Sequence, residues 1–432
     1  MRPHRSRRSR DRFALVACGA IAAGLLGAGA LRAQDPLGDA PDPFAEPAPV
    51  ASVDAVAAPG VAAVESAVPA FDPDAVSLTH PAPGFELHGR ANLTGALGGG
   101  DDDIDFLKDR SLELSSIDLY AQWFPTPWFG VQAEVELETE IVEDDRELEV
   151  DLELLVFEVR PLGDERLRLR LGWFPAPFGI ERRYYAPPRN ELATRPTSFT
   201  RLYPGDYSDL GVMLWARQPV APWGSDVELE LALVRGLEGP RVEDRPEAFQ
   251  EDSNHEPQLV GRLGWTLLDL DPERKGDHRW ARSLPARVKL TIGTSGLLGH
   301  YDRDARHRLA YVGYDAQLEL GGLRLRGEVV LSRVERLGPF GRDQRGVGMY
   351  ALVAYHIHPD WLLLDEAFVA FRYDVLDPDR GVEGTLDVAR YHWGVGWSPY
   401  PGLLLKAGWE LIKPRGRVDS QSQVYLEVGY SF

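Results

Sequence analysis

The stretch FGVQAEVELETEI, residues 129 to 141, decides which folds the chain can adopt. Its odd-numbered positions carry apolar side chains apart from Thr139, whereas the even-numbered positions from Gln132 to Glu140 carry amide or carboxylate groups. Successive side chains of a β-strand point to opposite faces, so this stretch predicts a strand that separates an apolar medium from a polar one. A soluble sandwich and a membrane barrel both provide two such faces, and this segment alone leaves both folds open.

Segments of the same kind recur from Gly84 to the end of the chain. We count sixteen of them, and bacterial single-chain membrane barrels require an even number. Polar loops follow the odd-numbered segments and tight turns with Pro or Gly follow most even-numbered ones, which is the asymmetry of long outer loops and short periplasmic turns. Only the connection at 268–284 is too long for this pattern. The predicted strands are 84–97, 110–124, 128–142, 146–160, 165–175, 207–217, 226–236, 257–267, 285–298, 308–320, 322–334, 346–357, 361–374, 386–398, 401–412 and 421–432.

Aromatic residues gather at the ends of the predicted strands, where a barrel needs amphipathic rings at the two membrane interfaces. A soluble core would place them nearer the middle of each strand. No run of about 18 apolar residues follows the N-terminal region, so no transmembrane helix is expected. The sequence therefore predicts an all-β fold, a 16-stranded antiparallel transmembrane β-barrel over residues 84–432. The expected girdle residues are Trp123, Phe124, Trp128, Trp173, Trp361, Tyr391, Trp393, Trp397, Trp409 and Tyr430.

Two segments precede the predicted barrel. Residues 1–33 have the basic start, apolar middle and small-residue cleavage site of a secretory signal peptide, with Arg7-Arg8 and the stretch before Cys18 leaving twin-arginine export and a lipoprotein signal as alternatives. Cys18 is the only cysteine and would leave with the signal, so no disulfide is expected in the mature chain. Residues 34–83 are rich in Ala and Pro without periodicity and predict a flexible periplasmic linker, with a cell-wall-binding segment as the alternative.

The end of the chain is the most specific single feature of the sequence. Val424, Leu426, Val428, Tyr430 and Phe432 alternate with mostly polar residues in a final predicted strand. A terminal strand that ends in Tyr-Ser-Phe resembles the signal read by the outer-membrane assembly machinery. We therefore assign Tyr430 and Phe432 to an assembly signal, and expect the chain in the outer membrane of a Gram-negative bacterium with lipid and that machinery as partners.

Three stretches carry a resemblance to a known family. GWFPAPFGIE at 172–181, FTRL at 199–202 and PGDYSDLGV at 204–212 resemble the phosphate-selective porin (porin O and P) family around its third loop. The resemblance implies a 16-stranded barrel, a homotrimer, a third loop that folds inward to narrow the pore, and basic side chains that guide anions. Ser208 departs from the family, which often has a basic residue there, and lysines are few.

Arginines around the predicted third loop form the candidate anion path. A row of guanidinium groups can replace the water shell of an anion at successive points, because each group donates several hydrogen bonds and stays charged. The alternative is that these arginines neutralise carboxylates of an acidic lumen wall, for which we expect Glu134, Glu136, Glu138 and Glu140. The candidate path is Arg166, Arg168 and Arg170 on the predicted strand 165–175, with Arg182, Arg183, Arg189, Arg195 and Arg201 in the loop.

Composition and motifs narrow the function further. The formal net charge of −20 makes nucleic acid an improbable partner. We find no nucleophile elbow, P-loop or Ser/His/acid set, and neither the acidic run 101–105 nor His356 with His358 makes a convincing metal site. No enzymatic activity, metal or cofactor is expected. The sequence predicts a porin for small hydrophilic solutes, anions such as phosphate, with an enzymatic or adhesive outer-membrane barrel and a soluble secreted β-protein as alternatives.

Overall fold

The computed structural model describes residues 84–99, 112–142, 145–184, 190–202, 207–221, 224–236, 256–270, 287–301, 307–338, 342–357, 366–380, 388–400, 402–414 and 420–431. The predicted signal peptide 1–33, the predicted linker 34–83, the acidic run 101–105, Trp361 and Phe432 lie outside these residues.

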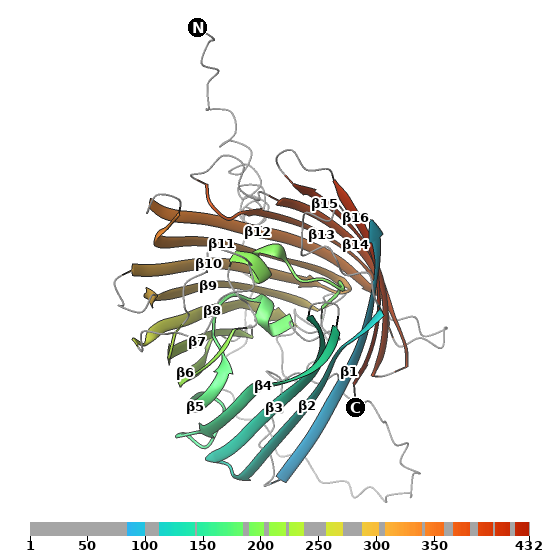
Figure 1. The fold of residues 1–432 in the computed structure, drawn as a ribbon. Coiled ribbons are helices and arrows are strands. Elements are labelled where there is room, and N and C mark those ends of the chain that lie inside the picture. Colours follow the sequence, from blue (N-terminus) through green and yellow to red (C-terminus); the bar gives the residue numbers. More distant parts are fainter. Residues whose placement is uncertain are drawn as a thin grey trace, which may run out of the picture. The chain divides into compact units, whose positions relative to one another are not determined.

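Sixteen strands form one closed antiparallel barrel, as the sequence predicts. Each strand pairs with its sequence neighbours, and β1 closes the ring by pairing with β16, for example Ala91 with Tyr430 (Figure 1). The strands are β1 (Gly84–Gly99), β2 (Leu112–Thr126), β3 (Phe129–Val142), β4 (Asp145–Val159), β5 (Leu167–Pro175), β6 (Ser208–Ala221), β7 (Ser225–Val234), β8 (Gln258–Leu270), β9 (Val288–Tyr301), β10 (His307–Leu320), β11 (Leu323–Gly338), β12 (Arg342–Ile357), β13 (Glu366–Asp377), β14 (Val388–Tyr400), β15 (Leu403–Pro414) and β16 (Gln421–Ser431).

The alternation along each strand sorts side chains between the outside and the inside of the ring. On β16 the exposed residues Val424, Leu426 and Val428 alternate with the buried polar residues Gln423 and Glu427. A soluble sandwich would bury the first set and expose the second. This inside-out arrangement, apolar outside and charged inside, is what a barrel with a lipid-facing surface requires. The predicted outward set, which follows this rule, is Val131, Val135, Leu137, Leu167, Leu169, Leu229, Leu231, Val424, Leu426 and Val428.

The short connections define one end of the barrel, which we call the turn end. They follow even-numbered strands, as at Pro127-Trp128 between β2 and β3 and Gly321-Gly322 between β10 and β11. The opposite end, where odd-numbered strands finish, is called the loop end. The strand starts differ most from prediction at β13, which begins at Glu366 and not at 361, and at β12, which begins four residues early at Arg342.

Two predictions about single residues are wrong. Arg166 lies in the turn before β5 and not on the strand, which begins at Leu167. Phe124 faces the interior, where it is 2% exposed and lies under the guanidinium of Arg160 at 4.2 Å from the ring centroid, so it is no part of an outer aromatic girdle. Both errors arise at strand ends, where alternation gives the weakest signal.

The interior also holds an apolar cluster. Inward-facing side chains from ten of the strands pack with residues that follow β5, and the resulting cluster contains Phe174, Ala176, Phe178, Leu202, Val260, Leu297, Tyr311, Val330 and Val334 among others. Phe178 meets Tyr311 edge to face, with ring centroids 6.4 Å apart. Apolar residues at inward positions would be unfavourable against open water, and here the chain between β5 and β6 covers them.

Candidate functional site: the segment between β5 and β6

The chain from 176 to 207, which we call the third-loop segment, connects β5 to β6. Its described parts are 176–184 and 190–202, with Tyr207 at its end, and they contain the short turns η4 (Glu181–Tyr184) and η5 (Ser198–Leu202). Figure 1 draws these turns within the ring of strands. The turn η5 contacts β11, β12 and β13, far along the ring from β5 and β6.

Gly179 lets the segment pass close to the wall. Its φ of 71° is a left-handed conformation that other residues rarely adopt. A Cβ there would lie 2.3 Å from the Glu328 carboxylate oxygen, so any side chain would also collide with β11. The Gly179 amide donates to the Ser295 hydroxyl of β9 at 2.9 Å. Glycine is therefore required here both by backbone conformation and by space.

One anchor of the segment is a pair of buried glutamates that share an arginine. The Arg326 guanidinium on β11 lies 3.0 Å from a Glu181 oxygen and donates to Glu191 at 2.9 Å. Glu181 also accepts a hydrogen bond from the Tyr350 hydroxyl on β12. Burial alone would raise the pKa of Glu191, but Arg326 and its other donors outweigh burial and hold that pKa well below its ordinary value. Glu191 is therefore ionised in its contact with Arg326.

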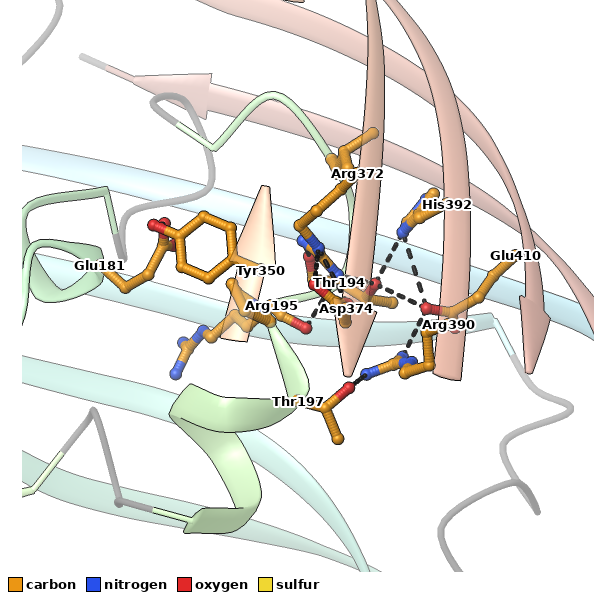
Figure 2. A network of polar contacts seen from close by, with 12 residues as sticks. Glu181, Thr194, Arg195, Thr197, Tyr350, Arg372, Asp374, Arg390, His392 and Glu410 are labelled. Carbon is orange, nitrogen blue, oxygen red and sulfur yellow. Dashed lines mark hydrogen bonds and ion pairs between the residues drawn. The ribbon is translucent and has the colours of Figure 1, made fainter. Parts of the chain in front are cut away.

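A second anchor joins the segment to β13, β14 and β15 (Figure 2). Arg372 donates to the backbone oxygens of Thr194 and Arg195, at 2.5 and 2.9 Å, while its Nε donates to Asp374 at 3.0 Å. The Thr194 hydroxyl lies 2.8 Å from Nδ1 of His392.

Arg390 completes this second anchor. It contacts Glu410 at 2.6 Å and donates to the Thr197 hydroxyl at 3.1 Å. Arg372, Asp374, His392 and Glu410 are almost fully buried. Buried charges of both signs are in direct contact here, and removing one partner would leave the others uncompensated.

Four of the eight predicted anion-path arginines form ion pairs in the structure. Arg168 is buried, lies 3.3 Å from Glu165 and stacks over the Trp215 ring at 4.2 Å. Arg170 donates to Glu158 at 2.8 Å. Arg182 pairs with Glu230 of β7, and the exposed Arg166 pairs with Asp164 in the turn. These contacts favour the alternative in which arginines neutralise interior carboxylates.

The remaining members of that set are described only in part. Arg195 is half-buried, with its guanidinium 5.8 Å from the centroid of the Phe199 ring. The side chains of Arg183 and Arg201 and the whole of Arg189 lie outside the described residues. The structure thus brings Arg168, Arg170 and Arg182 to the inner wall and leaves Arg166 in the turn.

The predicted acidic wall on β3 faces the interior. Glu134 lies 3.2 Å from Arg90, whose guanidinium also contacts Asp118 of β2 at 2.6 Å. Glu136 is buried and Glu138 is half-buried, while the side chain of Glu140 is not among those described. The wall is therefore a mixed ladder in which Arg90 offsets part of the negative charge.

Sequence reasoning missed the residues that hold the third-loop segment on the far wall. Arg326, Arg372, Arg390 and Glu410 were not singled out, although each is a charged residue at an inward position of a strand. That position is a signal, because a charge facing the interior of a barrel needs either water or a partner. The identity of the partner could not be read, since Glu191 is 135 residues from Arg326.

Comparison with solved structures fixes the fold. The chain is similar to the anion-selective porin from Comamonas acidovorans, with a TM-score of 0.54 and 11% identity over 81% of this chain and 99% of that one. The fold is that of an outer-membrane porin. The channel DcaP of Acinetobacter baumannii (TM-score 0.52) and Salmonella typhi OmpF in complex with daunomycin (0.51) are also similar, each 11% identical over 81% of this chain and 97% of theirs.

Sequence comparisons add no closer relative. No protein-family model matches the chain, and no curated protein matches it. Within the described part of the chain, no helix is long and apolar enough to cross a membrane. The same residues contain no group of three or more His, Cys, Asp or Glu side chains placed to hold a metal ion.

Proposed function

We propose that this protein is an outer-membrane porin, a water-filled channel for small hydrophilic solutes. The observation that carries the proposal is the inside-out alternation: apolar side chains ring the outside while ion-paired Arg, Asp and Glu line the inside. Lipid tolerates the first set and water the second, and a closed ring leaves no unpaired strand edge in the membrane. The resemblance around the third loop adds a homotrimer to the proposal.

In this proposal the third-loop segment narrows the channel. Support comes from its contacts with both walls: Arg182 pairs with Glu230 on β7, while Thr194 and Thr197 bond to β13 and β14. A segment tied to both walls crosses the path of any solute between them. Size selection would then arise where this segment lies.

Anions such as phosphate remain the proposed favoured solutes, with a weak preference only. The support is the concentration of arginines beside the third-loop segment. The pairing of Arg168 with Glu165 and of Arg170 with Glu158 leaves little uncompensated positive charge on that wall. A mixed ladder orients polar solutes by its transverse field and discriminates less steeply by charge than a row of unpaired arginines.

Two measurements test the channel. The purified protein should migrate differently on a gel before and after boiling, as a folded barrel does, and should give stepwise conductance in a planar bilayer. Reversal potentials in a potassium chloride gradient give the sign of the favoured ion. If the protein migrates equally before and after boiling and shows no conductance, the channel proposal is wrong. The adhesive or enzymatic outer-membrane barrel would then be the better hypothesis.

A further inference from the structure

A cavity of about 720 Å³ lies at the loop end of β11, β12 and β13. Its lining contains four arginines and only two aspartates, in a chain whose formal net charge is −20. A local excess of positive charge on so acidic a protein indicates a site for an anion. The lining residues are Leu331, Ser332, Arg333, Arg342, Asp343, Arg345, Gly346, Asp379 and Arg380.

Arg333 on β11 and Arg345 on β12 face outward and not into the channel. Val334 belongs to the interior apolar cluster, and a Cβ on Gly346 would touch Leu202 of the third-loop segment, so both positions face inward. Their neighbours Arg333 and Arg345 therefore face outward, on the same side as Leu331, which is 43% exposed. Leu331, Arg333 and Arg345 therefore place one side of the cavity on the outer surface of the barrel.

Two of the four guanidinium groups have no carboxylate partner among the described residues. Arg333 donates to Asp343 at 2.7 Å, and Arg342 pairs with Asp379. Arg345 and Arg380 are exposed and have no such pair. Arg345 is also directly opposite Arg333 in the strand ladder, and like charges so placed repel each other. An anion held between them would remove this repulsion.

The height of the cavity follows from the outward face of β12. From Ile357 towards the loop end, every outward position up to Val347 is apolar, and the next two are Arg345 and Asp343. On β11 the outward residues likewise change from Leu331 to Arg333. A run of about nine to eleven residues is what a tilted strand needs to cross the hydrocarbon. The arginines thus stand at the border where the hydrocarbon ends and headgroups begin.

We propose that this cavity binds the phosphate group of a membrane lipid headgroup. The guanidinium fork matches phosphate oxygens, Arg345 and Arg380 supply two forks that have no carboxylate partner among the described residues, and the exposed Leu331 below them contacts the start of an acyl chain. A free phosphate ion would use the same guanidinium groups but gain nothing from Leu331. The inference depends on the proposed membrane location and is independent of whether the channel conducts.

Native mass spectrometry of the full protein, purified in detergent from outer membranes, tests the proposal. The probes are dioleoylphosphatidic acid, dioleoylglycerol with the same chains and no phosphate, and inorganic phosphate. We expect phosphatidic acid to bind wild type more tightly than either of the others. Arg345→Gln with Arg380→Gln should weaken it by about five-fold for each arginine, the contribution of a basic residue near an anionic lipid surface.

The matched control is Arg166→Gln with Arg287→Gln, which removes the same charge from the exposed Arg166 and the half-exposed Arg287 at the turn end. This control should keep the wild-type affinity, and Arg345→Lys with Arg380→Lys should retain most of it. Equal losses in control and test variants would overturn the site. Equal affinity for inorganic phosphate and phosphatidic acid would overturn the lipid as its occupant. Gel migration before and after boiling verifies that each variant is folded. If a double variant does not fold, the two single Gln variants are measured in its place.

Discussion

At the scale of single residues, the outward positions carry the clearest energetic consequence. Leu169 on β5 is 41% exposed and its ladder partners are Val159 and Leu214, so its surroundings are apolar on both sides. Its neighbours Arg168 and Arg170 face inward to carboxylates. One position along the strand therefore changes the environment from lipid to ion pair, which is why a charge is tolerated at 168 and not at 169.

Leu169→Arg should lower the free energy of unfolding in lipid vesicles by about 2 to 4 kcal/mol, because it places a charge on the lipid face near the membrane midplane. Chemical denaturation in vesicles measures this. As a control, Leu162→Arg alters an exposed apolar residue in the turn after β4 and should change stability by no more than about 0.5 kcal/mol. An unaltered unfolding free energy in Leu169→Arg would contradict the assignment of the outer face.

At the scale of elements, the strands could be predicted from the sequence, but the position of the third-loop segment against the far strands could not. Alternation with period two marks a strand within a few neighbouring residues, so all sixteen were found, although β12 and β13 were misplaced at their starts. The contacts Glu191 to Arg326 and Thr194 to Arg372 join residues 135 and 178 positions apart. No local pattern encodes such a pairing, and the one local signal is that many strands carry apolar residues at inward positions, as on β8 and β11, which need a cover from water.

The stability of the contacts that hold the third-loop segment should depend on pH through Glu191. Its pKa in the folded protein is lowered, so its contribution to stability is present above the ordinary carboxyl pKa, about 4.3, and is lost as the pH falls through the folded-state value. Glu191→Gln leaves part of the Arg326 guanidinium without its acceptor and should cost about 1 to 3 kcal/mol near neutral pH. The difference from wild type should shrink as the solution is acidified below that pKa.

The free energies of unfolding of wild type and of Glu191→Gln, measured from near-neutral pH down into the acidic range, test this expectation. Glu335→Gln is a suitable control, because Glu335 is a loop-end carboxylate that accepts a hydrogen bond from the backbone amide of Arg308 at 3.2 Å. Glu335→Gln should change the free energy of unfolding only slightly at every pH. A difference between wild type and Glu191→Gln that grows on acidification would show that the glutamate is not held by Arg326.

At the scale of the whole molecule, assembly and permeation are separate properties of the same ring. β16 closes the barrel against β1, with Leu93 opposite Val428, so the last strand is part of the wall. We propose that the end of this strand is also the assembly signal. Deleting Phe432 should lower the amount of folded protein in the outer membrane while export to the periplasm continues. Fractionation followed by unboiled gels measures both, and normal folded levels in the deletion strain would refute the assembly role.

Permeation depends on where charge lies along the channel and not on the net charge of the chain. Charges beside a narrow segment act in confined, poorly screened space, whereas those at a wide mouth are screened within about 8 to 10 Å at physiological salt. Arg168 and Arg170 lie on the wall where the third-loop segment begins, and each offsets a carboxylate, Glu165 or Glu158. Their removal would expose negative charge at that point.

Arg168→Gln combined with Arg170→Gln should therefore shift the reversal potential toward cations. Arg160 still contacts Glu158 at 2.7 Å and Glu165 at 3.8 Å, so the barrel should fold with reduced stability. Arg217→Gln with Arg287→Gln removes the same charge from half-exposed arginines near the turn end, and should leave the reversal potential almost unchanged. If both double variants shift it equally, the third-loop segment does not control selectivity. If wild type is already plainly cation-selective, the acidic ladder of β3 is the better candidate for the selectivity element.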